Sequence, residues 1–222
     1  MNAFFIVGPF TFISSSTAFA TLPNDCIKLA DDSRAEMLKY KDGKSDEKTV
    51  VSSTKQVSEC IDKVDAKGKD QVKKEAIEAW GAFRKMREEK ILPVVVRYNQ
   101  TAQNNKTNLD QTKDALKALG QNAKAAECIE KADAARNALL LYKDGKGDEA
   151  TVNQTAQSTS TCIDGIDAKE KIQSKKDAVV AWKTFRSIRE GKIIPDVKYF
   201  MEQSKLNTAN LEKTKKALSA LN

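Results

Sequence analysis

The stretch CIKLADDSRAEMLKYKDGKSDEKTVVSSTKQVSEC (residues 26–60) occurs twice, returning as CIEKADAARNALLLYKDGKGDEATVNQTAQSTSTC (residues 128–162). A shift of 102 residues aligns the two copies without a gap. The match continues beyond them, because Trp80 aligns with Trp182 and Pro93 with Pro195. About half of the aligned positions are identical, so the chain contains an internal duplication. Each copy of the duplicated unit is one repeat.

Each copy of this stretch predicts a helical hairpin. In the first copy we expect a helix from about Asp25 to Lys41, ended by Gly43, which accepts the left-handed backbone of a helix C-terminus. Asp46 then suits the N-cap of a second helix that continues to about Val64. Runs of alternating β-branched residues are absent and proline is scarce, so the sequence predicts an all-α protein.

The cysteines fit the open end of such a hairpin. Cys26 lies 17 residues before Gly43, and Cys60 lies 17 residues after it. Residues equidistant from the turn face each other in an antiparallel hairpin, so we expect a Cys26–Cys60 disulfide. The same spacing around the second turn predicts a Cys128–Cys162 disulfide. The alternative is a metal site, which four cysteines without CxxC spacing, in a chain without histidine, fit poorly.

A third helix is expected to start near Asp70, or near Ser174 in the second repeat, and to be interrupted by the proline at 93 or 195. A seam of apolar and small residues then follows with steps of three and four. Its members are Val95, Tyr98, Ala102, Asn105, Leu109, Thr112, Leu116 and Leu119, and Val197, Phe200, Ser204, Asn207, Leu211, Thr214, Leu218 and Leu221. Each repeat is therefore expected to form a disulfide-stapled bundle of three or four helices.

The domain organisation predicted from these features has three parts. Residues 1–20 resemble a cleaved signal peptide, because an uncharged apolar run precedes Ala18-Phe19-Ala20. A buried N-terminal helix or a mis-assigned start are the alternatives. Residues 21–121 and 122–222 are then two helical units, each long enough to hold its own core and arranged as a rod or as a compact pair. No other stretch is apolar enough to cross a membrane, so a periplasmic or extracellular protein is expected.

The residues most suggestive of a binding site form a repeated cluster of aromatic and arginine side chains. Its members are Trp80, Phe83, Arg84 and Arg87 in the first repeat, and Trp182, Phe185, Arg186 and Arg189 in the second. Aromatic residues and arginine are typical of protein-binding hot spots. The alternative is core packing by the rings, with Arg87 paired to an acid such as Asp31 or Asp62.

The charge pattern restricts the possible partners. The net charge is +7, but basic and acidic residues are interleaved, whereas nucleic-acid binders concentrate positive charge on one face. A protein or an anionic surface polymer is the expected partner, and nucleic acid is not. The repeated Tyr40-Lys41-Asp42-Gly43-Lys44 segment is either a structural turn or an exposed contact loop.

Catalysis finds little support in the sequence. Histidine, the commonest general base, is absent, and there is no GxSxG, P-loop or GxGxxG motif. The cysteines are expected to be oxidised and therefore not nucleophilic. We expect neither enzymatic activity nor a cofactor or metal.

The segments Ala79-Trp80-Gly81-Ala82-Phe83-Arg84 and Ala181-Trp182-Lys183-Thr184-Phe185-Arg186 resemble the AW-x-x-[YF]-R segment of LprI-type lysozyme-inhibitor domains. Those are small, exported, cysteine-containing helical domains. The resemblance implies an inhibitor, with Trp80, Phe83, Arg84 and their copies as the matching positions. The favoured hypothesis remains an exported, non-enzymatic binding protein with two homologous units, and inhibition of a lysozyme-type or other cell-wall hydrolase is the alternative. A third hypothesis is an enzyme with unrecognised carboxylate chemistry.

Overall fold

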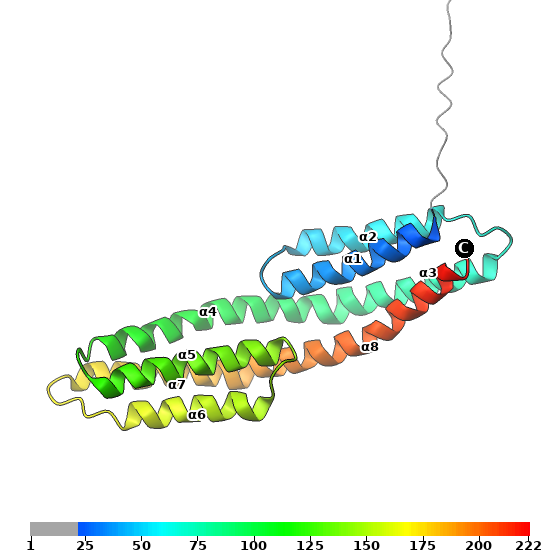
Figure 1. The fold of residues 1–222 in the computed structure, drawn as a ribbon. Helices are drawn as coiled ribbons and strands as arrows, with labels where there is room; N and C mark the ends of the chain where they lie inside the picture. Colours follow the sequence, from blue (N-terminus) through cyan, green and yellow to red (C-terminus); the bar gives the residue numbers. More distant parts are fainter. Residues whose placement is uncertain (1–21) are drawn as a thin grey trace, which may run out of the picture.

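The protein is an elongated bundle of helices (Figure 1), seen in a computed structural model that describes residues 22–222. The predicted signal peptide, residues 1–20, lies outside the described residues. Between residues 22 and 222 the chain forms eight α-helices and two short π-helical segments. Their bounds are α1 Pro23–Lys41, α2 Glu47–Lys63, α3 Asp70–Met86, η1 Arg87–Ile91, α4 Leu92–Lys117, α5 Ala123–Lys143, α6 Glu149–Asp164, α7 Ile172–Ile188, η2 Arg189–Ile193 and α8 Ile194–Ser219.

The two hairpins, α1–α2 and α5–α6, form as the repeated stretch predicts. Gly43 and Gly145 have φ values of +68° and +70°, the left-handed conformation that glycine adopts without strain. Asp46 accepts a hydrogen bond from the backbone N–H of Thr49 at 2.8 Å, and Asp148 accepts one from Thr151 at the same distance. The predicted N-cap at Asp46 is therefore confirmed, and Asp148 makes the same cap in the second repeat.

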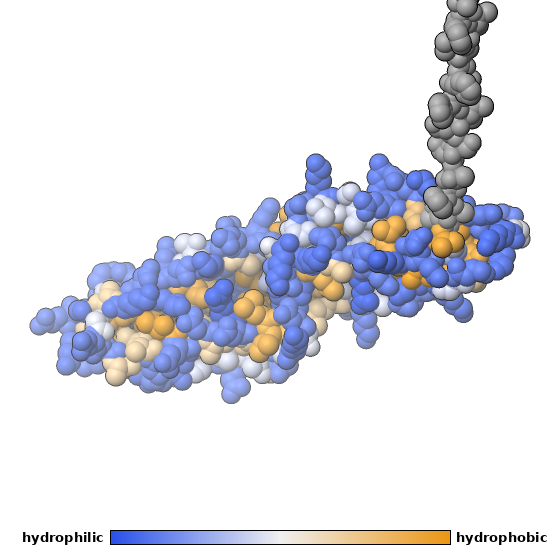
Figure 2. All heavy atoms as spheres, turned by 45° about the horizontal axis from the view of Figure 1, so that its top comes forward, coloured by the Kyte–Doolittle hydropathy of each residue, from blue (hydrophilic) through white to orange (hydrophobic). Residues whose placement is uncertain are grey.

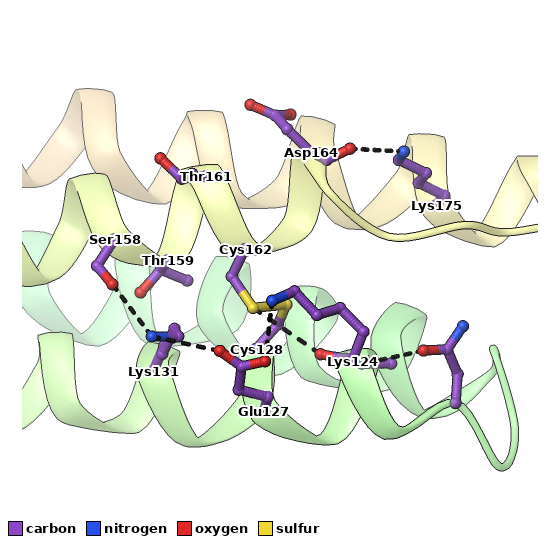
Figure 3. Close-up of a disulfide and its surroundings, with 12 residues drawn as sticks. Lys124, Glu127, Cys128, Lys131, Ser158, Thr159, Thr161, Cys162, Asp164 and Lys175 are labelled. Atoms are coloured by element: carbon purple, nitrogen blue, oxygen red, sulfur yellow. Dashed lines mark hydrogen bonds and ion pairs between the residues drawn. A yellow bond between two sulfur atoms is a disulfide. The ribbon is translucent and has the colours of Figure 1, made fainter.

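Both predicted disulfides are present, Cys26–Cys60 and Cys128–Cys162, each with its Cα atoms 5.5 Å apart. Figure 3 shows the second bridge joining α5 to α6 at the open end of the hairpin, beside an ion pair between Lys131 and Glu127. The two bridges use all four cysteines.

The remaining helices form two long rods, α3–η1–α4 and α7–η2–α8, and each rod passes through a π-helical turn just before its proline. The N–H of Leu92 bonds to the carbonyl of Arg87, five residues back. Pro93 offers no N–H, and its ring would crowd the carbonyl four residues before it in a regular α-helix. The wider π turn accommodates the proline and lets the helix continue. The predicted interruption is thus a π turn within one long helix.

The two rods pack antiparallel along the length of the molecule, so that α3 lies against α8 and α4 against α7 (Figure 1). Hairpin α1–α2 covers the α3–α8 end, and hairpin α5–α6 covers the α4–α7 end. The sequence repeats are therefore interlocked, because each four-helix bundle takes three helices from one repeat and one from the other.

Each hydrophobic core likewise contains side chains from both repeats. One core joins Cys26, Trp80 and Phe83 of the first repeat to Leu211 and Leu218 of the second. The opposite core joins Leu109 and Leu116 of the first repeat to Cys128, Trp182 and Phe185 of the second. This corrects the expectation that each repeat holds its own core. The predicted seam is confirmed as the buried face of α4 and α8, but from Tyr98 and Phe200 onward it packs on the other repeat.

Candidate functional site

Several polar contacts between the repeats occur in pairs, in which each contact recurs 102 residues away. Asn207 donates its side-chain amide to the Phe83 carbonyl at 3.1 Å, and Asn105 donates to the Phe185 carbonyl at 3.0 Å. Lys215 pairs with Asp31 at 2.9 Å, and Lys113 pairs with Asp133 at 2.8 Å. The first repeat therefore makes the same contacts to the second as the second makes to the first, which gives the molecule an approximate internal twofold symmetry.

The repeated Tyr-Lys-Asp-Gly-Lys turns provide the third pair of contacts. Lys41 pairs with Asp144 at 3.0 Å, and Lys143 pairs reciprocally with Asp42 at 2.7 Å. The Lys41 side chain is nearly buried and lies 6.0 Å from the ring centre of Phe200. These turns therefore contact each other, which is a structural role for a motif that the sequence left open between a turn and a contact loop.

Most of the predicted partner-binding residues are buried rather than displayed. Trp80 and Trp182 are 2% exposed, and their indole N–H groups donate to Ser58 and Ser160 at 3.0 and 2.9 Å. The rings of Phe83 and Phe185 stack on these indoles. The arginines Arg84 and Arg186 reach partly to solvent, where they pair with Glu88 and Glu190. The aromatic residues are thus core residues in this conformation, as the alternative interpretation holds.

Arg87 and Arg189 are also buried, at 2% and 0% exposure, and neither pairs with an acid among residues 22–222. Arg87 donates to the hydroxyl of Ser33 at 2.7 Å and to the Ser33 carbonyl at 3.0 Å. Its guanidinium lies 4.7 Å from the centre of the Phe83 ring. The expected pairing with Asp31 or Asp62 is therefore wrong, because Asp31 binds Lys215 instead. Burial lowers the pKa of Arg87 and of Arg189 to about 10.

Two clefts lie one on each side of the internal twofold, and Arg87 lines the first of them. The first cleft, about 200 Å³, lies between α1, the α3–η1 junction and α8. Its walls are Arg34, Met37, Leu38, Phe83, Arg87, Ile91, Phe200, Ser204, Lys205, Asn207, Thr208 and Leu211. Each cleft needs both repeats, since the wall contributed by α8 belongs to the second.

The second cleft, about 370 Å³, lies between α5, α7 and α4 and repeats the first almost position by position. Eleven of its walls are the 102-residue counterparts of first-cleft walls: Tyr98, Ala102, Gln103, Asn105, Lys106, Leu109, Arg136, Leu139, Leu140, Phe185 and Ile193. It is extended by Asn99, by Lys143 and by the turn residues Lys41, Asp42 and Gly43. The cleft is therefore a duplicated feature, like the disulfides.

Of the eight predicted partner-binding residues, only Phe83, Arg87 and Phe185 line these clefts. The sequence interpretation missed the other walls, among them Arg34 with Leu38 and Arg136 with Leu140. A signal for them exists, because an arginine precedes an outward-facing leucine by four residues at the same position in both repeats. Leu38 and Leu140 remain 44% and 39% exposed.

The surface outside the clefts is mostly hydrophilic. On the face shown in Figure 2, apolar side chains show through in separate areas along the length of the molecule and form no continuous patch. No helix of residues 22–222 combines the length and the apolar character needed to cross a membrane. Within the same range no three acidic or cysteine side chains gather into a metal-binding group.

Comparisons with protein-family models, with curated proteins and with solved structures find no significant match to this chain.

Proposed function

We propose that this chain is an exported, non-enzymatic binding protein whose two homologous clefts are its ligand sites. The observation that carries the proposal is the duplication of the cleft itself. An apolar recess with a few polar groups at its edge is the usual form of a small-molecule site. A recess that recurs with the same walls on both sides of an internal twofold is a property of the fold rather than a local packing defect.

Export is proposed from two features. Residues 1–20 have the composition of a signal peptide, and both disulfides are of the kind that persists in an oxidising compartment. The hydrolase-inhibitor hypothesis remains a prediction that an enzyme assay tests directly. Three residues of the first repeat match the segment typical of lysozyme-inhibitor domains. Trp80 and Phe83 are buried, and Arg84 is partly available to an enzyme.

An uncharged fluorescent probe, N-phenyl-1-naphthylamine, tests the binding function without any assumption about ligand charge. We expect two binding sites per chain in a fluorescence titration of the wild-type protein. Ser204 and Ala102 are half-buried counterparts on the walls of the first and second cleft. Ser204→Trp and Ala102→Trp should each remove one site, and the double variant should remove both.

The matched controls are Ala209→Trp and Thr107→Trp, which place the same side chain on exposed positions of α8 and α4 outside the clefts. These variants should retain both sites. If a cleft variant loses helicity by circular dichroism, Ser204→Leu or Ala102→Leu replaces it. Probe binding that is absent in the wild type, or equal in the cleft and control variants, would contradict the proposal.

A further inference from the structure

The first cleft has an unbalanced charge. Three cations line it, Arg34, Lys205 and Arg87, and no acidic residue does. None of the three forms an ion pair with a carboxylate of residues 22–222, whereas Lys215 on the same helix as Lys205 pairs with Asp31. The walls of the first cleft therefore carry a net positive charge.

Arg87 makes this imbalance costly for the unliganded protein. Arg87 is 2% exposed, and within residues 22–222 its guanidinium is bonded only to the hydroxyl and carbonyl oxygens of Ser33. It remains protonated at neutral pH even though burial lowers its pKa to about 10. A buried cation that has only neutral partners is poorly compensated for its lost hydration. An anion in the adjoining cleft would offset that cost.

The rest of the first cleft is apolar. Met37, Ile91, Phe200 and Leu211 are each less than a tenth exposed, and Leu38 lies at the edge with 44% of its surface in solvent. The volumes of 200 and 370 Å³ lie near or below the lower end of the range for ligand pockets, which is about 300–1,000 Å³. A recess of this size has room for a single alkyl chain.

The second cleft has the same character in spite of its different residues. Its cations are Lys41, Lys106, Arg136 and Lys143, and its one acid, Asp42, is already paired with Lys143. Arg136 forms no ion pair within residues 22–222, as is also true of its counterpart Arg34. Both clefts therefore combine an apolar wall with an unsatisfied positive charge at the edge.

We propose that each cleft binds a single-chain anionic amphiphile, with its alkyl chain against the apolar wall and its charged head group at Arg34 and Lys205 in the first cleft and at Arg136 in the second. This ligand class rests on the proposed binding function of the clefts. The head group is defined by its negative charge, which a carboxylate or a sulfate ester supplies equally. A guanidinium bonds such groups through two parallel N–H donors, which favours an anion over an uncharged oxygen.

Three probes with the same chain separate the head-group charges: dodecanoate, dodecanol and dodecyltrimethylammonium, each titrated below its micelle concentration by calorimetry or by displacement of N-phenyl-1-naphthylamine. We expect dodecanoate to bind at two sites and at least about tenfold more tightly than dodecanol, with the cation weakest. Dodecanol or dodecyltrimethylammonium binding as tightly as dodecanoate would overturn the ligand class.

The variants Arg34→Gln and Arg136→Gln each remove one of the exposed, unpaired arginines. Each should weaken dodecanoate binding at one site by about three- to tenfold and leave dodecanol binding unchanged. Lys44→Gln is the control, because it removes the same charge from an exposed turn position outside both clefts. An equal effect of Arg34→Gln and Lys44→Gln on dodecanoate binding would count against the head-group assignment.

The two proposals fail in different ways. If the uncharged probe binds at two sites but the three alkyl compounds bind alike, the clefts remain ligand sites and only the ligand class is wrong. If neither the probe nor any alkyl compound binds, both proposals are wrong.

Discussion

At the residue scale, the equivalent buried arginines Arg87 and Arg189 have different hydrogen-bond partners in the two repeats. Ser33 supplies a hydroxyl and a carbonyl to Arg87, whereas its counterpart in the second repeat is Ala135. Arg189 donates to the Ala135 carbonyl at 3.4 Å and to the carbonyl of Val152 at 2.7 Å, and its Nε has no partner within the described residues. Arg87 therefore depends on a side chain that the second repeat lacks.

Ser33→Ala should lower the free energy of unfolding by about 1.5–3 kcal/mol, because it removes a buried hydrogen bond to a charged group. Denaturant unfolding followed by circular dichroism measures the change. Ser52→Ala, an exposed substitution on α2, is the control and should change stability by less than about 0.5 kcal/mol. A loss of stability for Ser33→Ala no larger than for the control would show that the hydroxyl is dispensable.

Tyr98 gives the protein a dependence on alkaline pH. Burial, followed by the nearby charges of Asp144 and Asp42, raises the pKa of Tyr98 to about 12. The folded state therefore keeps a proton that the unfolded chain releases near pH 10, so the contribution of Tyr98 to stability falls as the pH rises from about 10 to 12. Tyr98 contributes up to about 2–3 kcal/mol to this loss.

Tyr98→Phe should remove this contribution, so that between about pH 10 and 11.5 the stability of the variant rises relative to that of the wild-type protein. The second repeat already has phenylalanine at the equivalent position, Phe200. The lowered pKa values of Arg87 and Arg189 act in the opposite direction but are common to both proteins, so they cancel in the comparison. Unfolding at a series of pH values measures the difference, and identical slopes would contradict the assignment.

At the scale of elements, the hairpins and the long rods are held by different interactions. Helix α2 presents a narrow apolar face, with Val50, Val57 and Ile61 among its buried residues, and a surface rich in serine and threonine. The disulfide therefore has a large share in keeping α2 on α1. The rods instead bury a long seam and are joined to each other by the asparagines at 105 and 207.

Replacing Cys26 and Cys60 together by alanine should lower the free energy of unfolding by about 3–4 kcal/mol, because the bridge closes a loop of 35 residues in the unfolded chain. The Cys128→Ala, Cys162→Ala pair closes a loop of the same length and should cost about as much. Denaturant titration under non-reducing conditions measures both. A loss below about 1 kcal/mol would show that the hairpin is held by its packing alone.

At the scale of the whole molecule, the exchange of rods makes the two repeats inseparable. Every core contains side chains from both repeats, and the end of α8 is capped from the other repeat by Lys69, which donates to the Ala220 carbonyl at 2.8 Å. Lys171 caps the end of α4 through the Ala118 carbonyl at 2.9 Å in the same way. The segment between α4 and α5, residues 118–122, is the only covalent link between the halves.

A protease site inserted at Gly120-Gln121-Asn122 and cut after folding should leave the two halves in one particle by gel filtration, because their association depends on shared cores rather than on the linker. Each disulfide joins two cysteines of the same repeat and none links the two repeats, so the cut halves should separate in denaturant. Separation of the halves under native conditions would mean that the repeats are independent bundles after all.

Much of this fold could be predicted from the sequence because it depends on local patterns. The turn at Gly43, the N-cap at Asp46 and the disulfide pairing follow from residues close together in the chain or equidistant from a turn. The π turns could not be predicted, since Pro93 signals an interruption without specifying its form. The clefts were largely missed, because their walls come from α1, α3 and α8, whose proximity no spacing in the sequence reveals.

The sequence by itself determined the duplication, the helices, the paired cysteines and which face of each helix is buried. Only the tertiary structure decided against which helix each face packs. The seams of α4 and α8 are nearly the same, so their periodicity is compatible with packing on either repeat. Each rod continues through its π turn and carries its seam away from its own hairpin, and the nearest apolar surface then belongs to the other repeat.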